Sequence, residues 1–114
     1  MQMKGSFLGE FEEVVLLATW VLKDQAYANT VRAEVEKHTQ RDINLSAIHS
    51  ALYRMERKGF LSSELGEASA KRGGKRKRHF YVSAKGTQAL NEIKRIRESF
   101  WQLVPATSAK GGTL

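Results

Sequence analysis

Apolar residues recur at helical spacing in the first quarter of the chain. In the segment LGEFEEVVLLATWVL, residues 8–22, they return every three or four positions behind three glutamates, whose negative charge suits the start of a helix. This wide stripe predicts a largely buried helix, with Phe11 and Trp20 in the core. Residues 23–25 form a polar break, and a narrower apolar face predicts a second helix over residues 26–38. That narrower face consists of Tyr27, Val31 and Val35.

A polar turn over residues 39–44 leads to a third helix, predicted over residues 45–58. Asn44 is a good N-cap for this helix, because an Asn side chain can accept a hydrogen bond from a free N–H of the first turn. Gly59 is a natural left-handed stop just after the helix. The inward apolar stripe, with spacings of three, four and three residues, comprises Leu45, Ile48, Leu52 and Met55.

Two short alternating segments then predict a β-hairpin, with strands over residues 60–65 and 78–83 and a basic, glycine-containing loop over residues 66–77. Ser83 is placed to cap a fourth helix over residues 84–104. This helix carries an apolar seam with spacings of four, three, four and three residues, which is typical of helices that pair. The seam comprises Ala89, Ile93, Ile96, Phe100 and Leu103.

The order helix, helix, turn, helix, hairpin and long helix predicts a mainly α fold with a small β-hairpin. It is the order of a winged helix-turn-helix followed by a long C-terminal dimerisation helix. We expect a winged helix-turn-helix DNA-binding domain over residues 1–83, a dimerisation helix over 84–104 and a flexible tail over 105–114. The hairpin loop, residues 66–77, is then the wing, which is long enough to reach a phosphate backbone.

Composition agrees with one small soluble domain. The chain has 114 residues, of which 41% are hydrophobic, and it has no cysteine, which excludes disulfides and thiolate metal sites. The longest apolar run, Val14 to Ala18, is too short to span a bilayer, and the start lacks the pattern of a signal segment. We therefore expect a cytoplasmic protein with no membrane association.

The positive charge is concentrated in one part of the sequence. The formal net charge is +7, and residues 68–91 contain seven Lys or Arg and no acid, so the twelve bases and twelve acids elsewhere cancel. Such a concentration favours a polyanionic partner, since self-repulsion would otherwise disfavour it. The alternatives are a solvated loop kept for solubility and, from the tract KRGGKRKR, a nuclear-import signal.

The wing has the residues needed to bind DNA phosphates. Lys and Arg at the tip of a ribbon can pair with phosphates or enter a narrow minor groove. Gly73 and Gly74 allow the loop to approach closely, because no Cβ restricts φ there. The candidate phosphate contacts are Lys71, Arg72, Lys75, Arg76, Lys77 and Arg78.

The predicted third helix is the candidate recognition helix. In a helix-turn-helix, the N-terminal residues of the second helix of the motif meet base edges in the major groove. The outward face here is polar or small, as that role requires, although an ordinary surface helix has the same character. Ser and His can bond base edges, Ala can contact a thymine methyl, and Arg farther along can reach phosphates. The candidate contacts are Asn44, Ser46, Ala47, His49, Ser50, Tyr53, Arg54 and Arg57.

Other apolar residues are candidates for a dimer interface. Trp101 stands beside the seam of the fourth helix, where it can pack against a partner or stack on a planar ligand. The candidate interface residues are Phe11, Ile93, Ile96, Phe100, Trp101 and Leu103.

No residue pattern indicates an enzyme, a cofactor or a metal site. No histidine has a histidine partner at i, i+4, and Gly73-Gly74 lies in a basic hairpin instead of a phosphate-binding loop between a strand and a helix. We therefore expect a binding protein.

Three stretches resemble the PadR family of bacterial winged-helix transcriptional regulators. They are LGEFEEVVLLA (8–18), LYRMERKGFL (52–61) and RGGKRKRHFYVSAKG (72–86), and with their spacing they cover residues 8 to about 103. The last stretch, a basic wing followed by Ser-x-x-Gly, is the most specific. The chain is similar to a short form of the family with a single C-terminal dimerisation helix.

The resemblance implies a homodimer, held by the long C-terminal helix and the first helix, that binds a near-palindromic operator. It also implies repression of genes for detoxification, efflux or stress, in some members relieved by a small aromatic effector, for which Trp101 is the candidate contact here. The family often has Tyr at the position of His49. Two other hypotheses are a basic RNA- or ribosome-associated winged-helix protein and a protein-interaction adaptor.

Overall fold

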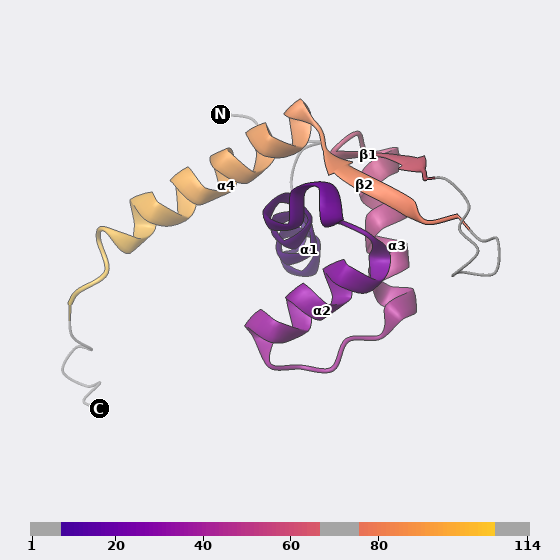
Figure 1. The fold of residues 1–114 in the computed structure, drawn as a ribbon. Helices are drawn as coiled ribbons and strands as arrows, with labels where there is room; N and C mark the ends of the chain where they lie inside the picture. The colour runs from indigo at the N-terminus through magenta and orange to yellow at the C-terminus, as the bar shows by residue number, and fades with distance from the viewer. Residues whose placement is uncertain (1–7, 67–75, 107–114) are drawn as a thin grey trace.

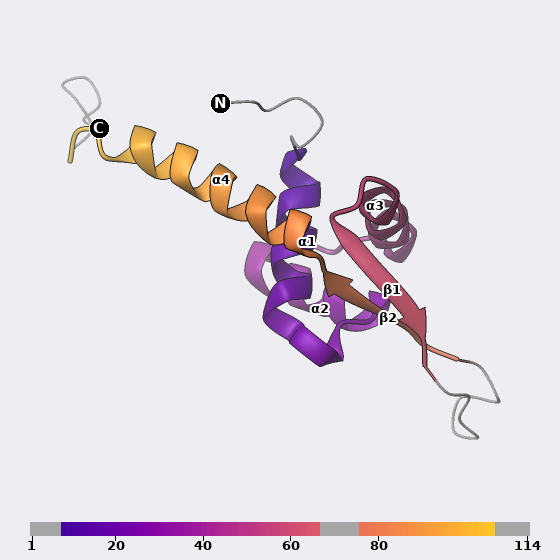
Figure 2. The ribbon, with the colours of Figure 1, turned by 90° about the horizontal axis from the view of Figure 1, so that it is seen from above.

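The computed structural model describes residues 8–66 and 76–106 (Figure 1). Three helices form a compact body, a two-stranded antiparallel hairpin lies against it, and a last helix leads away from it (Figures 1 and 2). The predicted mainly α fold with one small hairpin is confirmed. The elements are α1 (Glu10–Leu22), the short 3-10 helix η1 (Lys23–Gln25), α2 (Ala28–Thr39), α3 (Leu45–Arg57), β1 (Leu61–Leu65), β2 (Arg78–Val82) and α4 (Ala84–Trp101).

The core lies where α1, α2, α3 and β2 meet. The predicted stripe of α3 points into it, with Ile48, Leu52 and Met55 fully buried and Leu45 half-buried at the edge. Phe80 of β2 closes the core from the hairpin side. No helix in residues 8–66 and 76–106 combines the length and hydropathy needed to cross a bilayer.

The start of α2 differs from the sequence-based expectation. The helix begins at Ala28 and not at Ala26, because Ala26 is extended and its carbonyl accepts a hydrogen bond from Phe80 N–H of β2 at 2.9 Å. The N–H of Tyr27, the N-cap residue, donates to Thr30 Oγ1 at 2.9 Å. Ala26, which lies between η1 and α2, therefore holds the hairpin to the helical body through this hydrogen bond.

The end of α3 is as predicted. Gly59 has φ +89°, the left-handed conformation that a glycine adopts without strain, so the chain turns there into Phe60 and β1. In the hairpin, Leu61 pairs with Val82 and Leu65 pairs with Arg78.

Helix α1 is less buried than expected. Trp20 is 40% exposed and Val21 62% exposed, so the expectation that Trp20 lies in the core is wrong for the single chain. The reason is that α2, α3 and β2 cover the opposite side of α1, where Val15 and Leu16 are fully buried. Phe11 is half-buried against the core.

Helix α4 buries apolar side chains only in its first half, and Arg97 farther along bonds Glu13 of α1. Ser83 caps it by accepting a hydrogen bond from Gly86 N–H at 3.0 Å, as predicted. Ile93 is 7% exposed, whereas Phe100 is 67% exposed, and the end of the helix extends away from the body (Figure 2). The helix ends at Trp101 and not at Val104, because the N–H groups of Leu103 and Val104 bond three residues back in a tighter turn before Pro105.

Gly86, the glycine of the Ser-x-x-Gly stretch, lies where α4 crosses the entry to β1. A Cβ there would overlap the carbonyl oxygen of Phe60 and stand 2.8 Å from Val82 Cγ1. The glycine therefore allows α4 to pack directly on backbone.

Replacing Gly86 with Ala should destabilise the fold by about 1–3 kcal/mol, because the methyl group meets backbone that cannot move aside. Urea denaturation measures the change. Gly66→Ala is the control, because its Cβ would have no neighbour closer than 3.5 Å, and we expect it to stay within about 0.5 kcal/mol of the wild type. Equal stability of the two variants would contradict the packing argument.

Candidate nucleic-acid interface

The outward face of α3 is polar and lies opposite its buried stripe. Ser46, Ser50, Tyr53 and Arg57 follow one another at spacings of four, three and four residues, and all four are exposed. Asn44 is the N-cap, as predicted, and its Oδ1 accepts hydrogen bonds from the backbone N–H and the hydroxyl of Ser46 at 2.8 and 2.6 Å. Asn44 thus fixes the start of the helix and the orientation of its first outward side chain.

A row of aromatic rings joins α3 to the hairpin. The His49 ring is stacked on Tyr53 with 6.0 Å between centroids and an interplanar angle of 13°. Tyr53 in turn meets Phe80 of β2 edge to face, also at 6.0 Å. Because Phe80 is fixed in the core, these contacts hold the His49 side of α3 at a set position relative to β2.

Helix α3 and the base of the wing line one groove. A cavity of about 160 Å³ is bordered by His49 and Tyr53 of α3 and by Lys77 and Arg78 at the start of β2. Lys77 Nζ lies 4.4 Å from the centroid of the Tyr27 ring, in a cation–π contact. The base of the wing therefore lies beside the outward face of α3.

The same groove includes residues that the sequence analysis missed. Tyr27, Asn29 and Thr30, at the start of α2, line it together with the α3 and β2 residues. The first N–H groups of a helix have no intrahelical acceptor and suit an anion, so this end of α2 can add to a phosphate site. The sequence gives one indication that these residues line a shared groove, because their helix is the first of the helix-turn-helix pair. The sequence analysis instead placed Tyr27 in the apolar face of that helix.

The described wing bases are held by the hairpin itself. Arg76 donates from Nε to the carbonyl of Gly66 at 2.7 Å, and Arg78 donates from Nη1 to Ser63 Oγ at 2.9 Å. Ser63 donates to Glu56 Oε2 at 2.7 Å, which connects the hairpin to α3. Lys71, Arg72 and Lys75, the other predicted wing contacts, lie outside the described residues.

His79 lies at the root of the wing on the other face of β2. It is 6% exposed, between Tyr27 at 5.2 Å and Tyr81 at 4.1 Å, and within the described residues neither ring nitrogen has a hydrogen-bond partner. The Tyr81 hydroxyl donates to Glu64 at 2.7 Å, and this bond raises the pKa of Tyr81. No group of three or more His, Cys, Asp or Glu within residues 8–66 and 76–106 could hold a metal ion.

The structure gives Arg54 a partner that the sequence analysis did not predict. Its Nε donates to Oε2 of Glu12 on α1 at 2.7 Å, and Lys58 Nζ reaches the same carboxylate at 3.2 and 3.3 Å. Oε1 of Glu12 also accepts the N–H of Gly9 at 3.1 Å. Arg54 is thus drawn toward α1, away from the centre of the outward face, because a nearly buried carboxylate needs its charge.

This setting shifts the pKa of Glu12. Burial alone raises the pKa, but hydrogen bonds from Arg54, Gly9 and Lys58 outweigh burial, and the net pKa is lowered from its ordinary value of 4.5. Glu12 therefore remains ionised in the folded protein.

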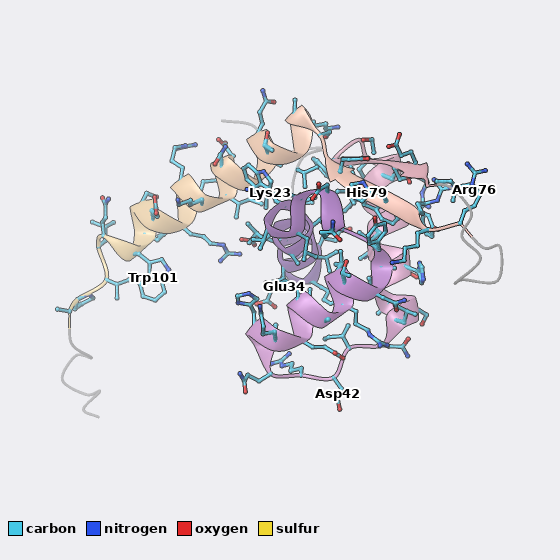
Figure 3. The ribbon with its side chains drawn as sticks, in the orientation of Figure 1. Lys23, Glu34, Asp42, Arg76, His79 and Trp101 are labelled. Carbon is cyan, nitrogen blue, oxygen red and sulfur yellow. The ribbon has the colours of Figure 1, made fainter. Side chains whose placement is uncertain are left out.

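The predicted dimer residues divide into two groups. Ile93 is already buried against its own chain, Ile96 is half-buried, and Phe100, Trp101 and Leu103 are 67%, 69% and 80% exposed. Trp101 lies at the far end of α4, on the opposite side of the molecule from Arg76 (Figure 3).

An apolar groove follows α1 and α2. Its cavity of about 450 Å³ is lined largely by aliphatic side chains, which include Val14, Leu17, Val21 and Val35. A neighbouring cavity of about 310 Å³, lined by Phe11, continues it. The single chain thus exposes apolar side chains on α1 and on the end of α4.

Comparison with solved structures confirms the fold. A PadR-like transcription factor from Bacteroides fragilis superimposes with a TM-score of 0.62 at 20% identity, over 82% of this chain and 89% of that one. A PadR-like transcriptional regulator from Bacillus cereus gives 0.60 at 19% identity, over 92% and 97% of the two chains. The Orc1 protein of Aeropyrum pernix in complex with DNA gives 0.62 at 18% identity, over 83% of this chain but 27% of that one.

Neither a protein-family model nor a curated protein sequence matches the chain. The similarity is therefore one of architecture: the protein has the winged-helix fold found in PadR-like transcriptional regulators.

Replacing Glu12 with Gln should destabilise the fold by roughly 1.5–3 kcal/mol at neutral pH, the range for hydrogen bonds to charged groups. Because the folded-state pKa is lowered, the carboxylate stabilises fully above about pH 4.5, and this stabilisation is lost as the pH falls through the folded-state pKa. Urea denaturation from pH 7 to pH 3 should therefore show the difference between the two proteins shrinking. A constant difference would contradict the role of the charge.

Proposed function

We propose that the protein binds double-stranded DNA as a homodimer and regulates transcription, as a repressor acting on a near-palindromic operator. One observation carries the proposal: His49 and Tyr53 of the recognition helix and Lys77 and Arg78 of the wing line a single groove. A duplex that fills the space beside α3 meets cations from the hairpin at the same time.

The contacts divide into two kinds. Base edges in the major groove are met from the N-terminal half of α3, where Ser46, Ser50 and His49 supply hydroxyl and imidazole groups. Phosphates are met by Arg57 of α3, by the wing bases and by the start of α2. Direct contacts thus supply sequence selection, and the charged groups supply most of the affinity.

The dimer follows from the apolar surfaces of α1 and α4. A second copy, related by a two-fold axis, can place Phe100, Trp101 and Leu103 of its α4 against the groove of α1 and α2, which is lined by aliphatic side chains. Each chain then covers the surface that the other leaves exposed. The two recognition helices meet half-sites about one turn of B-DNA apart, roughly 34–36 Å or a multiple of that.

The proposal includes a small aromatic effector that binds the protein by stacking on Trp101. An exposed tryptophan such as Trp101 offers a flat apolar ring for stacking. Cytoplasmic DNA is the expected target.

The proposal is tested by selecting bound duplexes from a random DNA pool at moderate salt. A near-palindromic consensus supports it, and recovery of unrelated sequences would remove specific regulation. Competition with structured RNA separates the alternative function, because an RNA- or ribosome-associated protein would prefer RNA to the selected duplex.

Removal of the described wing cations should weaken binding to every duplex. The double variant Arg76→Ala, Lys77→Ala should flatten the slope of log K against log salt by about 1.8 per protomer, because each phosphate contact contributes roughly 0.9. Fluorescence anisotropy between 50 and 200 mM salt measures the slope, a range in which such contacts change affinity strongly.

The matched control is Lys37→Ala, Lys94→Ala, which removes the same charge from exposed positions on α2 and α4. It should leave the slope nearly unchanged. Equal effects of the two double variants would mean that net charge, and not the wing, governs DNA affinity.

Phe100→Asp should convert the dimer to a monomer, because it places a charge at an apolar contact of the proposed interface. Ser99→Asp adds the same charge at a neighbouring exposed position and should leave the dimer intact. Sedimentation velocity distinguishes the two masses. A dimer that persists in the Phe100 variant would place the interface elsewhere.

A further inference from the structure

The Glu12 carboxylate holds two cations of the recognition helix away from its outward face. Both oxygens of Glu12 are bonded: Oε2 accepts from Arg54 Nε at 2.7 Å, and Lys58 Nζ lies 3.3 Å from Oε1 and 3.2 Å from Oε2. The Glu12 side chain is 7% exposed, whereas those of Arg54 and Lys58 are 42% and 40% exposed. One acid of α1 therefore holds two bases that remain partly open to solvent, Arg54 of α3 and the C-cap residue Lys58.

These two bases stand next to the proposed DNA contacts. Arg54 is four residues after Ser50 and three before Arg57, so the three side chains are neighbours on the helix surface. Lys58 follows Arg57 directly as the C-cap residue. Without Glu12, both long cationic side chains could swing toward a phosphate backbone beside α3.

We propose that Glu12 is a positioning residue that withholds Arg54 and Lys58 from DNA phosphates, and so limits the sequence-independent part of DNA affinity. This rests on the proposed DNA-binding function. Phosphate contacts strengthen binding to all sequences alike, so withholding two of them raises the ratio of operator to random-duplex affinity.

Leaving Glu12 is unfavourable for the two bases. If Arg54 turned to a phosphate, a nearly buried carboxylate would lose its strongest hydrogen bond, and an unpaired buried charge is costly. The exposed Arg57 has no such partner among the described residues and is free to meet DNA. Glu12 thereby determines which cations of α3 can contact DNA phosphates.

Glu12→Gln should increase affinity for random duplex and steepen its salt dependence. If both released cations reach phosphates, the slope of log K against log salt becomes steeper by about 1.8 per protomer. Between 50 and 200 mM salt, this adds roughly a twelve-fold loss of affinity per protomer to the wild-type loss. A destabilised recognition helix alone would weaken binding and would not steepen the slope.

The matched control is Glu13→Gln, one residue along α1. Glu13 accepts from Arg97 Nη2 at 2.7 Å and Nε at 3.2 Å, so this variant removes the same charge but releases a cation of α4. Its salt slope should remain that of the wild type. An equal steepening in both variants would overturn the proposal in favour of a general charge effect.

A second pair of measurements keeps the proposal testable if Glu12→Gln folds poorly. Arg54→Gln and Lys58→Gln, each in the otherwise wild-type chain, should leave the slope unchanged, because Glu12 already holds both bases away from the phosphates. A flattening of about 0.9 per protomer in either variant would show that the base already reaches a phosphate and would overturn the proposal. A wild-type protein that binds no duplex even at low salt would instead remove the proposed function itself.

Discussion

The attachment of the hairpin to the helical body sets the geometry of the proposed site. Phe80 is buried in the core and its N–H donates to the carbonyl of Ala26, so β2 is fixed both by packing and by a hydrogen bond to the segment before α2. At the other end of the strand, Ser83 N–H bonds the carbonyl of Phe60. Because β2 is held at both places, Lys77 and Arg78 leave the body on the side where α3 presents His49 and Tyr53. A hairpin attached only by its turn would not place the wing reproducibly beside the recognition helix.

The basic side chains differ in the groups to which they are bonded. Arg76 and Arg78 are bonded to neutral oxygens, the Gly66 carbonyl and the Ser63 hydroxyl, and so retain their full charge for a polyanion. Arg54 and Lys58 share one acid, whose single negative charge offsets one of their two positive charges. Net charge alone does not describe the electrostatics of this surface, since two bases of equal formal charge differ according to the group that holds them.

Much of the fold could be predicted because it depends on local patterns. The buried stripe of α3, the caps at Asn44 and Ser83 and the left-handed Gly59 are each determined within a few residues, and all are found. The errors concern contacts between distant segments. Nothing near Ala26 shows that its carbonyl would bond Phe80, and Glu12 lies 42 residues from Arg54, so a pattern along one helix could not reveal their ion pair. Likewise, periodicity identifies an apolar face on α1 but not whether the same chain covers that face. The predicted core position of Trp20 is wrong for the single chain for this reason.

Helix α1 connects the two surfaces on which the proposed function depends. On one side, Glu12 holds α3 through Arg54 and Lys58; on another, α1 and α2 leave an apolar groove open. The groove and the end of α4 cannot cover each other within one chain, because α4 leads away from the body (Figure 2). Burial of large apolar side chains is worth about 1.5–3 kcal/mol each, so both surfaces favour a second copy. A partner seated on α1 would then contact the same rigid helix that holds the recognition helix, and the spacing between the two recognition helices would follow from packing on α1 instead of from a flexible linker.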